Sequence, residues 1–223
     1  HGSLRDFLHQ SDPLHKYKHK YAGSGTPMTE KNIAKYGRDV LEGMLFLKQL
    51  GIPCYHLHAG NVVVDPPRRC AITDIENNVL GQPPRHAAVI RELAAKGVQP
   101  DVACFACVLF EMASGYELTS LQAADVLLSP TSSCPDAVRN VLTSIIAPWA
   151  TTPPDVEDLL RLDLFASVVP AQPVPKLAVT MPTVVQQLFL ASAEALEASV
   201  LHIARHAPPK SPRQHVHVSY GGP

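Results

Sequence analysis

Four polar residues in the first third of the chain have side chains that could take part in chemistry. His56 and His58 lie two positions apart in the segment C-Y-H-L-H-A-G-N, which ends at Asn61, and Asp74 follows thirteen residues later. An imidazole with an ordinary pKa can accept a proton near neutral pH, whereas amide and carboxylate oxygens can bind Mg²⁺. The residue types therefore raise two possibilities, a proton-accepting group and a pair of magnesium ligands.

A zinc or redox site is not indicated. The spacing of His56 and His58 fits no standard zinc pattern. Cys104 and Cys107 form a C-x-x-C, but they lie in the apolar segment D-V-A-C-F-A-C-V-L-F-E-M, with no second ligand pair nearby. Packing inside a buried helix is the favoured interpretation of these cysteines. We therefore expect no resident metal or cofactor.

The four polar residues lie around a predicted hairpin that follows a predicted helix. Thr29 and Glu30 begin a pattern of apolar residues at three- and four-residue intervals that continues to Gly51. The stretch 62–73 contains two short β-prone runs separated by a proline-rich turn. These patterns predict one long amphipathic helix and, directly after the segment with the two histidines, a small β-hairpin.

A second helix, apolar on almost all sides, is predicted from Asp101 to Gly115. Asp101 is placed to cap the first turn, and Gly115 can take the left-handed conformation that often ends a helix. A helix without a polar face belongs in the centre of a domain. Shorter helical patterns follow at 135–146 and 154–164.

The character of the sequence changes after residue 168. Prolines between 169 and 182 predict an extended linker. Thr183 and Gln186 have the spacing of a capping box for a helix over 183–206, whose apolar stripe could pack on the chain itself or on a partner. The stretch 207–223 is rich in proline and is expected to be disordered.

The order of helix, loop, hairpin, loop and central helix is that of a protein-kinase C-terminal lobe. The segment C-Y-H-L-H-A-G-N aligns without gaps on the catalytic loop H-R-D-L-x-x-x-N. I-T-D-I-E around Asp74 resembles the D-F-G segment, the helix from Asp101 resembles the central kinase helix, and G-S-L-R-D-F-L near the start resembles the segment after the hinge. The resemblance covers 1–168. It predicts a mainly α fold, a kinase C-lobe with a small β-hairpin at the catalytic loop, plus a C-terminal helix.

The combination of H-L-H-A-G-N with D-I-E most resembles the PX-domain-containing kinase-like and slowpoke-binding proteins, and this resemblance implies a pseudokinase. His56 stands where kinases carry the catalytic Asp, Tyr55 replaces the preceding Arg, and His58 replaces the Lys two positions later. Cys54 takes the place of the kinase spine His. A positioned general base contributes about 10²–10⁴ in rate, and imidazole has no negative charge to orient the donor. With the loop degenerate at these four positions, no catalytic residue is expected.

The resemblance assigns roles to three further residues. Asn61 and Asp74 stand where kinases hold Mg²⁺, so weak Mg-ATP binding is conceivable; in the alternative interpretation both side chains satisfy backbone groups. The Gly-rich loop and strand lysine that grip the phosphates belong to an N-lobe, which this sequence is expected to lack. Asp101 is expected to be buried and to hold the backbone near Tyr55 and His56. The rival function is a weak ATP-binding Ser/Thr protein kinase, completed by an upstream N-lobe.

Composition narrows the classes of partner. The chain has 223 residues, 46% of them hydrophobic and 17% charged, and a formal net charge of −1. This is enough for one globular domain, and the scattered basic residues create no field that would hold nucleic acid. No apolar run approaches the roughly 20 residues of a bilayer span, so no transmembrane segment is expected.

Protein partners and a cytoplasmic location are the remaining expectations. Five cysteines in apolar settings do not form a disulfide framework and suit a reducing compartment. The family resemblance implies as partners a calcium-activated potassium channel, membrane-trafficking machinery or 14-3-3 proteins. Association with a membrane would then occur through these partners.

Overall fold

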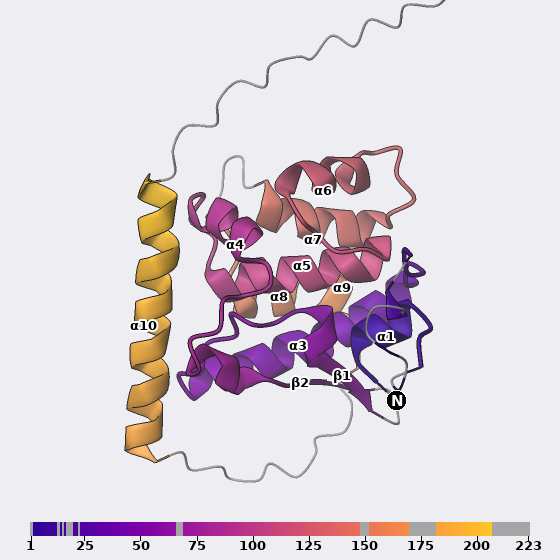
Figure 1. The fold of residues 1–223 in the computed structure, drawn as a ribbon. Coiled ribbons are helices and arrows are strands. Elements are labelled where there is room, and N and C mark those ends of the chain that lie inside the picture. The colour runs from indigo at the N-terminus through magenta and orange to yellow at the C-terminus, as the bar shows by residue number, and fades with distance from the viewer. Residues whose placement is uncertain are drawn as a thin grey trace, which may run out of the picture.

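The structure is a computed structural model, and it describes residues 2–12, 14, 16, 20–21, 23–65, 69–147, 152–169 and 182–206, with some residues after 192 described by their backbone alone. Within this part the fold is mainly helical with one two-stranded antiparallel sheet, which is compatible with a kinase C-lobe (Figure 1). The elements are α1 (Leu4–Leu8), α3 (Glu30–Gln49), η1 (Ala59–Asn61), β1 (Val62–Asp65), β2 (Arg69–Ile72), η2 (Ile75–Asn78), α4 (Ala87–Ala94), α5 (Pro100–Ser114), α6 (Leu121–Leu128), α7 (Asp136–Ile146), α8 (Val156–Arg161), α9 (Asp163–Ala166) and α10 (Thr183–His206).

The predicted long helix is α3. Thr29 takes the N-cap position with extended backbone, and the chain turns away at Gly51, where φ is +71°. Residues spaced by three or four, among them Ile33, Tyr36 and Val40, are buried along one side. The amphipathic pattern in the sequence is therefore the cause of both the helix and its orientation.

The predicted central helix is α5, and every side chain from 102 to 113 is buried. Its start differs from the prediction. Gln99 takes the N-cap position and Pro100 the first helical position, so Asp101 lies inside the first turn and does not cap it. Proline suits this place because the first N–H groups of a helix have no intrahelical acceptor. Gly115 ends the helix with φ of +78°, as predicted.

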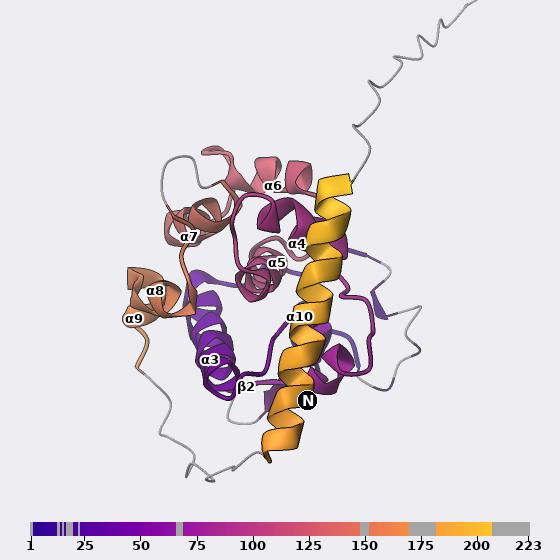
Figure 2. The same cartoon turned by 90° about the vertical axis from the view of Figure 1, so that its left-hand side faces the viewer.

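Helices α3 and α5 lie side by side and run in opposite directions (Figures 1 and 2). The segment leading into α3 is hydrogen-bonded to the end of α5: Met28 N–H donates to the Met112 carbonyl at 2.8 Å, and Gly25 N–H to the Gly115 carbonyl at 2.7 Å. This pair of helices forms the centre of the core. The loop with the two histidines begins where α3 ends.

The predicted hairpin is confirmed as the antiparallel pair β1 and β2. Val62 pairs with Ile72 and Asp65 with Arg69. One face packs on α3, and an isolated bridge between Ser3 and Val63 joins the other edge of β1 to the start of the chain. The hairpin therefore fixes the segment before α1 beside the loop that precedes β1.

The later helices agree in part with the sequence patterns. The pattern at 135–146 corresponds to α7, whereas the one at 154–164 divides into α8 and α9, because Leu162 has extended backbone. Phe165 anchors α9 in the core, with its ring in edge-to-face contact with that of Phe105 at 5.9 Å. Helices α1, α4 and α6 are not indicated by the patterns above.

Helix α10 crosses the end of the bundle where α3 ends and α5 begins (Figure 2). It packs on α4 and η2, and among those of its side chains that the structure describes, Phe189 is buried. The Pro182 carbonyl accepts hydrogen bonds from the N–H groups of Val185 and Gln186, which is what an N-cap residue does. The predicted capping box is therefore wrong, because Thr183 lies within the first turn.

The linker predicted for 169–182 and the tail predicted for 207–223 fall almost wholly outside the described residues. Among the helices that are described, none combines the length and the apolar character that crossing a bilayer requires.

Candidate functional site

The loop that resembles the kinase catalytic loop lies between α3 and β1, against α5. The Leu57 N–H donates to the Cys54 carbonyl at 3.0 Å and closes a turn, and the His58 ring accepts from the Gly60 N–H through Nδ1 at 3.1 Å. Cys104 of α5 contacts the loop through a weak Sγ hydrogen bond to the Tyr55 carbonyl at 3.4 Å. Local turns and a buried helix thus fix the loop backbone.

His56 is buried, with 8% of its surface exposed. Burial lowers the pKa of its imidazole, although a hydrogen bond with the backbone of Gln82 opposes this shift. Among the described residues, its Nε2 has no hydrogen-bond partner. The ring is therefore uncharged at neutral pH and enclosed by the protein.

His58 is half-buried and lies close to a second histidine, His86, with their ring centroids 6.3 Å apart. Burial, followed by the charges of Arg85 and Arg5, lowers the pKa of His58 to about 3. Burial also lowers the pKa of His86 to about 4, despite the opposing charge of Glu117. Both rings are neutral at physiological pH.

Asn61 and Asp74 lie at the same end of the hairpin. The Asn61 carbonyl accepts hydrogen bonds from the Thr73 N–H at 2.9 Å and the Thr73 hydroxyl at 3.2 Å, which places Asp74 next to it in space. Asn61 is buried, and its amide donates to the His56 carbonyl at 3.2 Å. Asp74 is exposed and has a left-handed backbone with φ of +57°, which is uncommon outside glycine and often marks functional sites.

These two side chains make a poor magnesium site on their own. Mg²⁺ needs six oxygen ligands in a regular octahedron. Asn61 offers one amide oxygen, since only its Nδ2 is used in the bond to the His56 carbonyl, Asp74 offers one carboxylate, and the side chains of His56 and His58 have no oxygen. In the part of the chain that the structure describes, no group of three or more His, Cys, Asp or Glu side chains is arranged to hold a metal ion.

Asp101 is half-buried, where burial was expected. Helix α5 begins one residue earlier than predicted, so the carboxylate lies in its first turn, near the end of α3. Its charge acts there on Lys48 and Cys54; burial, followed by this charge, raises the pKa of the Cys54 thiol to about 12. The carboxylate therefore lies close to the start of the loop.

A buried ionic network, which no motif in the sequence indicates, lies beside His58 and His86. Arg5 of α1 donates through Nε to Glu111 Oε1 at 2.6 Å and through Nη2 to Glu111 Oε2 at 2.8 Å. Its Nη2 also lies 2.9 Å from Glu117 Oε1, and Arg85 forms a second ion pair with Glu117. The Arg5 and Arg85 contacts lower the pKa of Glu117 to about 2, although burial opposes the shift. The signal that could have revealed this network is Glu111, a charged residue inside the apolar run of α5.

No protein-family model matches the chain. Several curated proteins are similar to it, among them the three that follow. The "Probable inactive serine/threonine-protein kinase slob2" of Dictyostelium discoideum is 42% identical over 165 residues, which cover 74% of this chain and 28% of that protein. The "Slowpoke-binding protein" of Drosophila melanogaster is 30% identical over 176 residues, 75% of this chain and 34% of that protein.

A third relative is the "PX domain-containing protein kinase-like protein" of Mus musculus, 32% identical over 173 residues, 75% of this chain and 29% of that protein. The chain is a relative of these kinase-like proteins. The family resemblance seen in the motifs is thus confirmed. The first of these relatives is named a probable inactive kinase and this one a kinase-like protein, and these names support a pseudokinase type for the chain. It spans about a third or less of the length of each relative.

Proposed function

We propose that this chain is a non-catalytic, kinase-like scaffold that binds other proteins. The observation that carries the proposal is the state of His56, which stands at the position of the kinase catalytic Asp. Its imidazole is buried and, because its pKa is lowered, uncharged at neutral pH. Such a ring supplies no negative charge to orient a hydroxyl, and its burial keeps a substrate away.

Protein binding is supported by a relative. The Drosophila protein is named for binding Slowpoke. By this resemblance we propose a calcium-activated potassium channel as partner, with ion-channel regulation as the outcome. Membrane-trafficking machinery and 14-3-3 proteins, which the family resemblance also implies, stay predictions without support from the names of the relatives. A cytoplasmic location, with membrane association through partners, belongs to the same proposal.

We propose the same division into parts as the sequence suggests: a kinase-like C-lobe over 1–168, a linker over 169–182, a helix over 183–206 and a tail over 207–223. Within the lobe, Asp101 is proposed to hold the start of the degenerate loop. Its electrostatic influence on Cys54 supports this role. Helix α10, which packs on α4 and η2, is proposed as an element that partners contact or displace.

Nucleotide binding is proposed to be weak. Asn61 and Asp74 could fill only a few of the six coordination positions of a Mg²⁺ ion, so phosphate oxygens and water would have to fill the others. Melting temperature with and without Mg-ATP, together with a phosphotransfer assay on generic substrates, tests this. A ligand at one hundred times its dissociation constant stabilises by about 2.7 kcal/mol, so tight binding would be visible. A large magnesium-dependent shift that disappears in Asp74→Ala, with phosphate transfer, would establish the rival kinase function.

The scaffold proposal itself is tested by binding. The purified chain is immobilised and presented with the purified cytoplasmic region of a calcium-activated potassium channel. Saturable binding that is unchanged by Asp74→Ala and by removal of nucleotide is expected of a non-catalytic scaffold. Binding that requires Mg-ATP and an intact Asp74 would contradict the proposal, and absence of any binding would remove this channel as its partner.

A further inference from the structure

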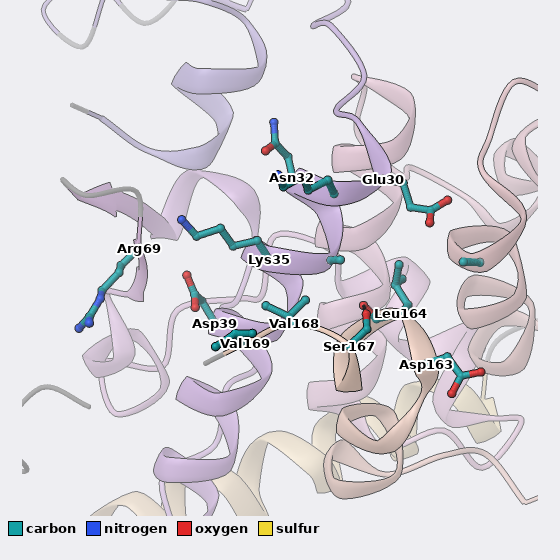
Figure 3. Close-up of a pocket in the computed structure, with 13 residues that line it drawn as sticks. Glu30, Asn32, Lys35, Asp39, Arg69, Asp163, Leu164, Ser167, Val168 and Val169 are labelled. Atoms are coloured by element: carbon teal, nitrogen blue, oxygen red, sulfur yellow. Dashed lines mark hydrogen bonds between the residues drawn. The ribbon is translucent and has the colours of Figure 1, made fainter. Parts of the chain in front are cut away.

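A groove of about 840 Å³ lies between the N-terminal half of α3, helix α9 and strand β2 (Figure 3). It lies on a different part of the lobe from the loop that resembles the kinase catalytic loop. A volume of this size is typical of sites that enclose a ligand of several hundred daltons. The groove is therefore large enough for a few residues of another chain.

The two ends of the groove carry different charges. Lys35 and Arg69 lie together at one end, beside Asp39, whereas Glu30 and Asp163 lie on the other side (Figure 3). One carboxylate oxygen of Asp39, Oδ2, already accepts a hydrogen bond from the Cys70 N–H at 3.1 Å, so it is less available to a ligand. Burial also raises the pKa of this carboxyl group. Two basic side chains and one carboxylate thus lie at one end, and the carboxylates of Glu30 and Asp163 lie at the other.

The formal charges of the whole groove balance. Its lining contains three basic side chains, Lys31, Lys35 and Arg69, and the three acidic ones named above. A uniformly anionic surface, such as nucleic acid or an acidic membrane, would gain nothing from this arrangement. A ligand with its own separated positive and negative groups would be attracted at both ends.

The middle of the groove is apolar. Leu164, Val168 and Val169 lie between the charged ends (Figure 3). Val169 is 87% exposed, although it is a large apolar side chain. Covering it with an apolar group removes hydrocarbon surface from water, which is favourable.

The length of the groove suits a short extended peptide. Glu30 and Lys35, which stand at opposite ends, are five residues apart on α3, about 7.5 Å along the helix at 1.5 Å per residue, and their side chains extend in different directions (Figure 3). An extended chain of three or four residues, at about 3.3 Å each, covers about 10–13 Å, which spans this separation. Three or four residues can therefore place opposite charges at the two ends and an apolar side chain between them.

We propose that this groove binds a short extended segment of a partner protein, with an apolar residue on Val168 and Val169, an acidic residue at the Lys35–Arg69 end, and a basic residue at the Glu30–Asp163 end. The inference rests on the proposed function, protein binding, and narrows it to one surface.

The test uses two fluorescent peptides, Glu-Glu-Leu-Val-Lys-Lys and its reverse Lys-Lys-Val-Leu-Glu-Glu, with Glu-Glu-Leu-Val-Glu-Glu as an anionic control. Fluorescence anisotropy with the full chain should show one dipolar peptide binding more tightly than a dissociation constant of about 1 mM. The anionic control should bind more weakly. Failure of both dipolar peptides, or equal binding of the anionic one, overturns the proposal.

A charge exchange identifies the site. Lys35→Glu should weaken the favoured peptide about fivefold, since each exposed ion pair contributes only about 0.2–1 kcal/mol and reversal adds repulsion. Replacing the glutamates of that peptide with lysine should restore part of the loss. Lys96→Glu makes the same change of charge in the turn that follows α4, outside the groove, and should leave binding unaltered. An equal effect of Lys35→Glu and Lys96→Glu would overturn the assignment to the groove.

The result of the groove experiment can be told apart from the result of the channel-binding experiment that tests the proposed function. If the immobilised chain captures the channel region but Lys35→Glu and Arg69→Glu do not weaken that capture, and the peptides do not bind, the scaffold function stands and the groove proposal fails. If the peptides bind at the groove but the channel region does not, the groove stands and the channel is the wrong partner.

Discussion

Arg5 and Glu111 form a buried, two-pronged ion pair between side chains 106 positions apart in the sequence. Only 5% of the Arg5 side chain and 1% of the Glu111 side chain are exposed. Burial disfavours the charged guanidinium, but the hydrogen bonds and charges of Glu111 and Glu117 outweigh it and raise the pKa of Arg5. The pair ties the first helix to the central one, close to the degenerate loop.

Arg5→Ala should therefore destabilise the lobe strongly. Removing one partner leaves an uncompensated buried charge, which typically costs about 3–5 kcal/mol. Urea denaturation followed by circular dichroism measures the loss. The double variant Arg5→Met with Glu111→Met should recover most of it, because no charge is then left unpaired. A loss as small as that of Arg161→Ala, whose side chain is 72% exposed, would show that the buried pair contributes little.

Acid should destabilise the protein from about pH 6.5 downward. The pKa values of folded His58 and His86 are about 3 and about 4, against 6.5 for an ordinary histidine. Between these limits the unfolded chain binds protons that the folded chain does not, so the free energy of unfolding falls as the pH falls. Each group contributes up to about 1.4 kcal/mol per pH unit. Below pH 4.5 the Glu117 carboxylate adds to this effect. Its pKa in the folded protein is about 2, so the unfolded chain takes up a proton first and the free energy of unfolding falls further.

Denaturation curves at pH 7, 6 and 5 measure this slope. His86→Asn keeps a polar side chain of smaller size that does not titrate, and it should make the slope between pH 6.5 and 5 shallower. An equal slope in wild type and His86→Asn would mean that His86 does not titrate on unfolding as described.

Gly115→Ala should lower stability for two reasons that can be separated. The residue has φ of +78°, and a Cβ there would lie 2.2 Å from the Gly25 carbonyl oxygen. Gly97 has a similar φ of +85° but open space around the added Cβ. Gly97→Ala should therefore cost about 1–2 kcal/mol from backbone conformation alone, and Gly115→Ala clearly more. Equal losses in urea denaturation would show that the approach of Gly25 is not restrictive.

The parts of the fold that the sequence predicts are those whose signals are local. The long helix, the hairpin and the central helix follow from apolar spacing, turn residues and an uninterrupted apolar run, and all three are present within one or two residues. Helices α1, α4 and α6 have eight residues or fewer, too short for a pattern to stand out. The break at Leu162 between α8 and α9 is likewise invisible in the spacing of apolar residues.

In the candidate site, too, the features with a local sequence signal are predicted and those that depend on distant contacts are not. The motif resemblance locates the loop, and the structure places Asn61 and Asp74 side by side at the hairpin. The exposure of Asp101 depends on the residue at which its helix begins. Sequence patterns predict that residue only to within one or two positions. The contacts of Arg5 with Glu111 and the groove between α3 and α9 arise from packing of distant segments. No local pattern encodes which segments meet.

Phe189 should be the residue that holds α10 on the lobe. It is 9% exposed, whereas its neighbour Leu188 is 52% exposed on another side of the same helix. Phe189→Ala should release the helix, because a buried aromatic side chain supplies much of the apolar area in such a small contact. Hydrogen exchange should then accelerate in α10 and in η2 beneath it, while α3 and α5 stay protected. Leu188→Ala is the matched control and should change neither. If both variants accelerate exchange equally, loss of helix propensity, and not loss of the Phe189 contact, is the cause, and α10 is not held through Phe189.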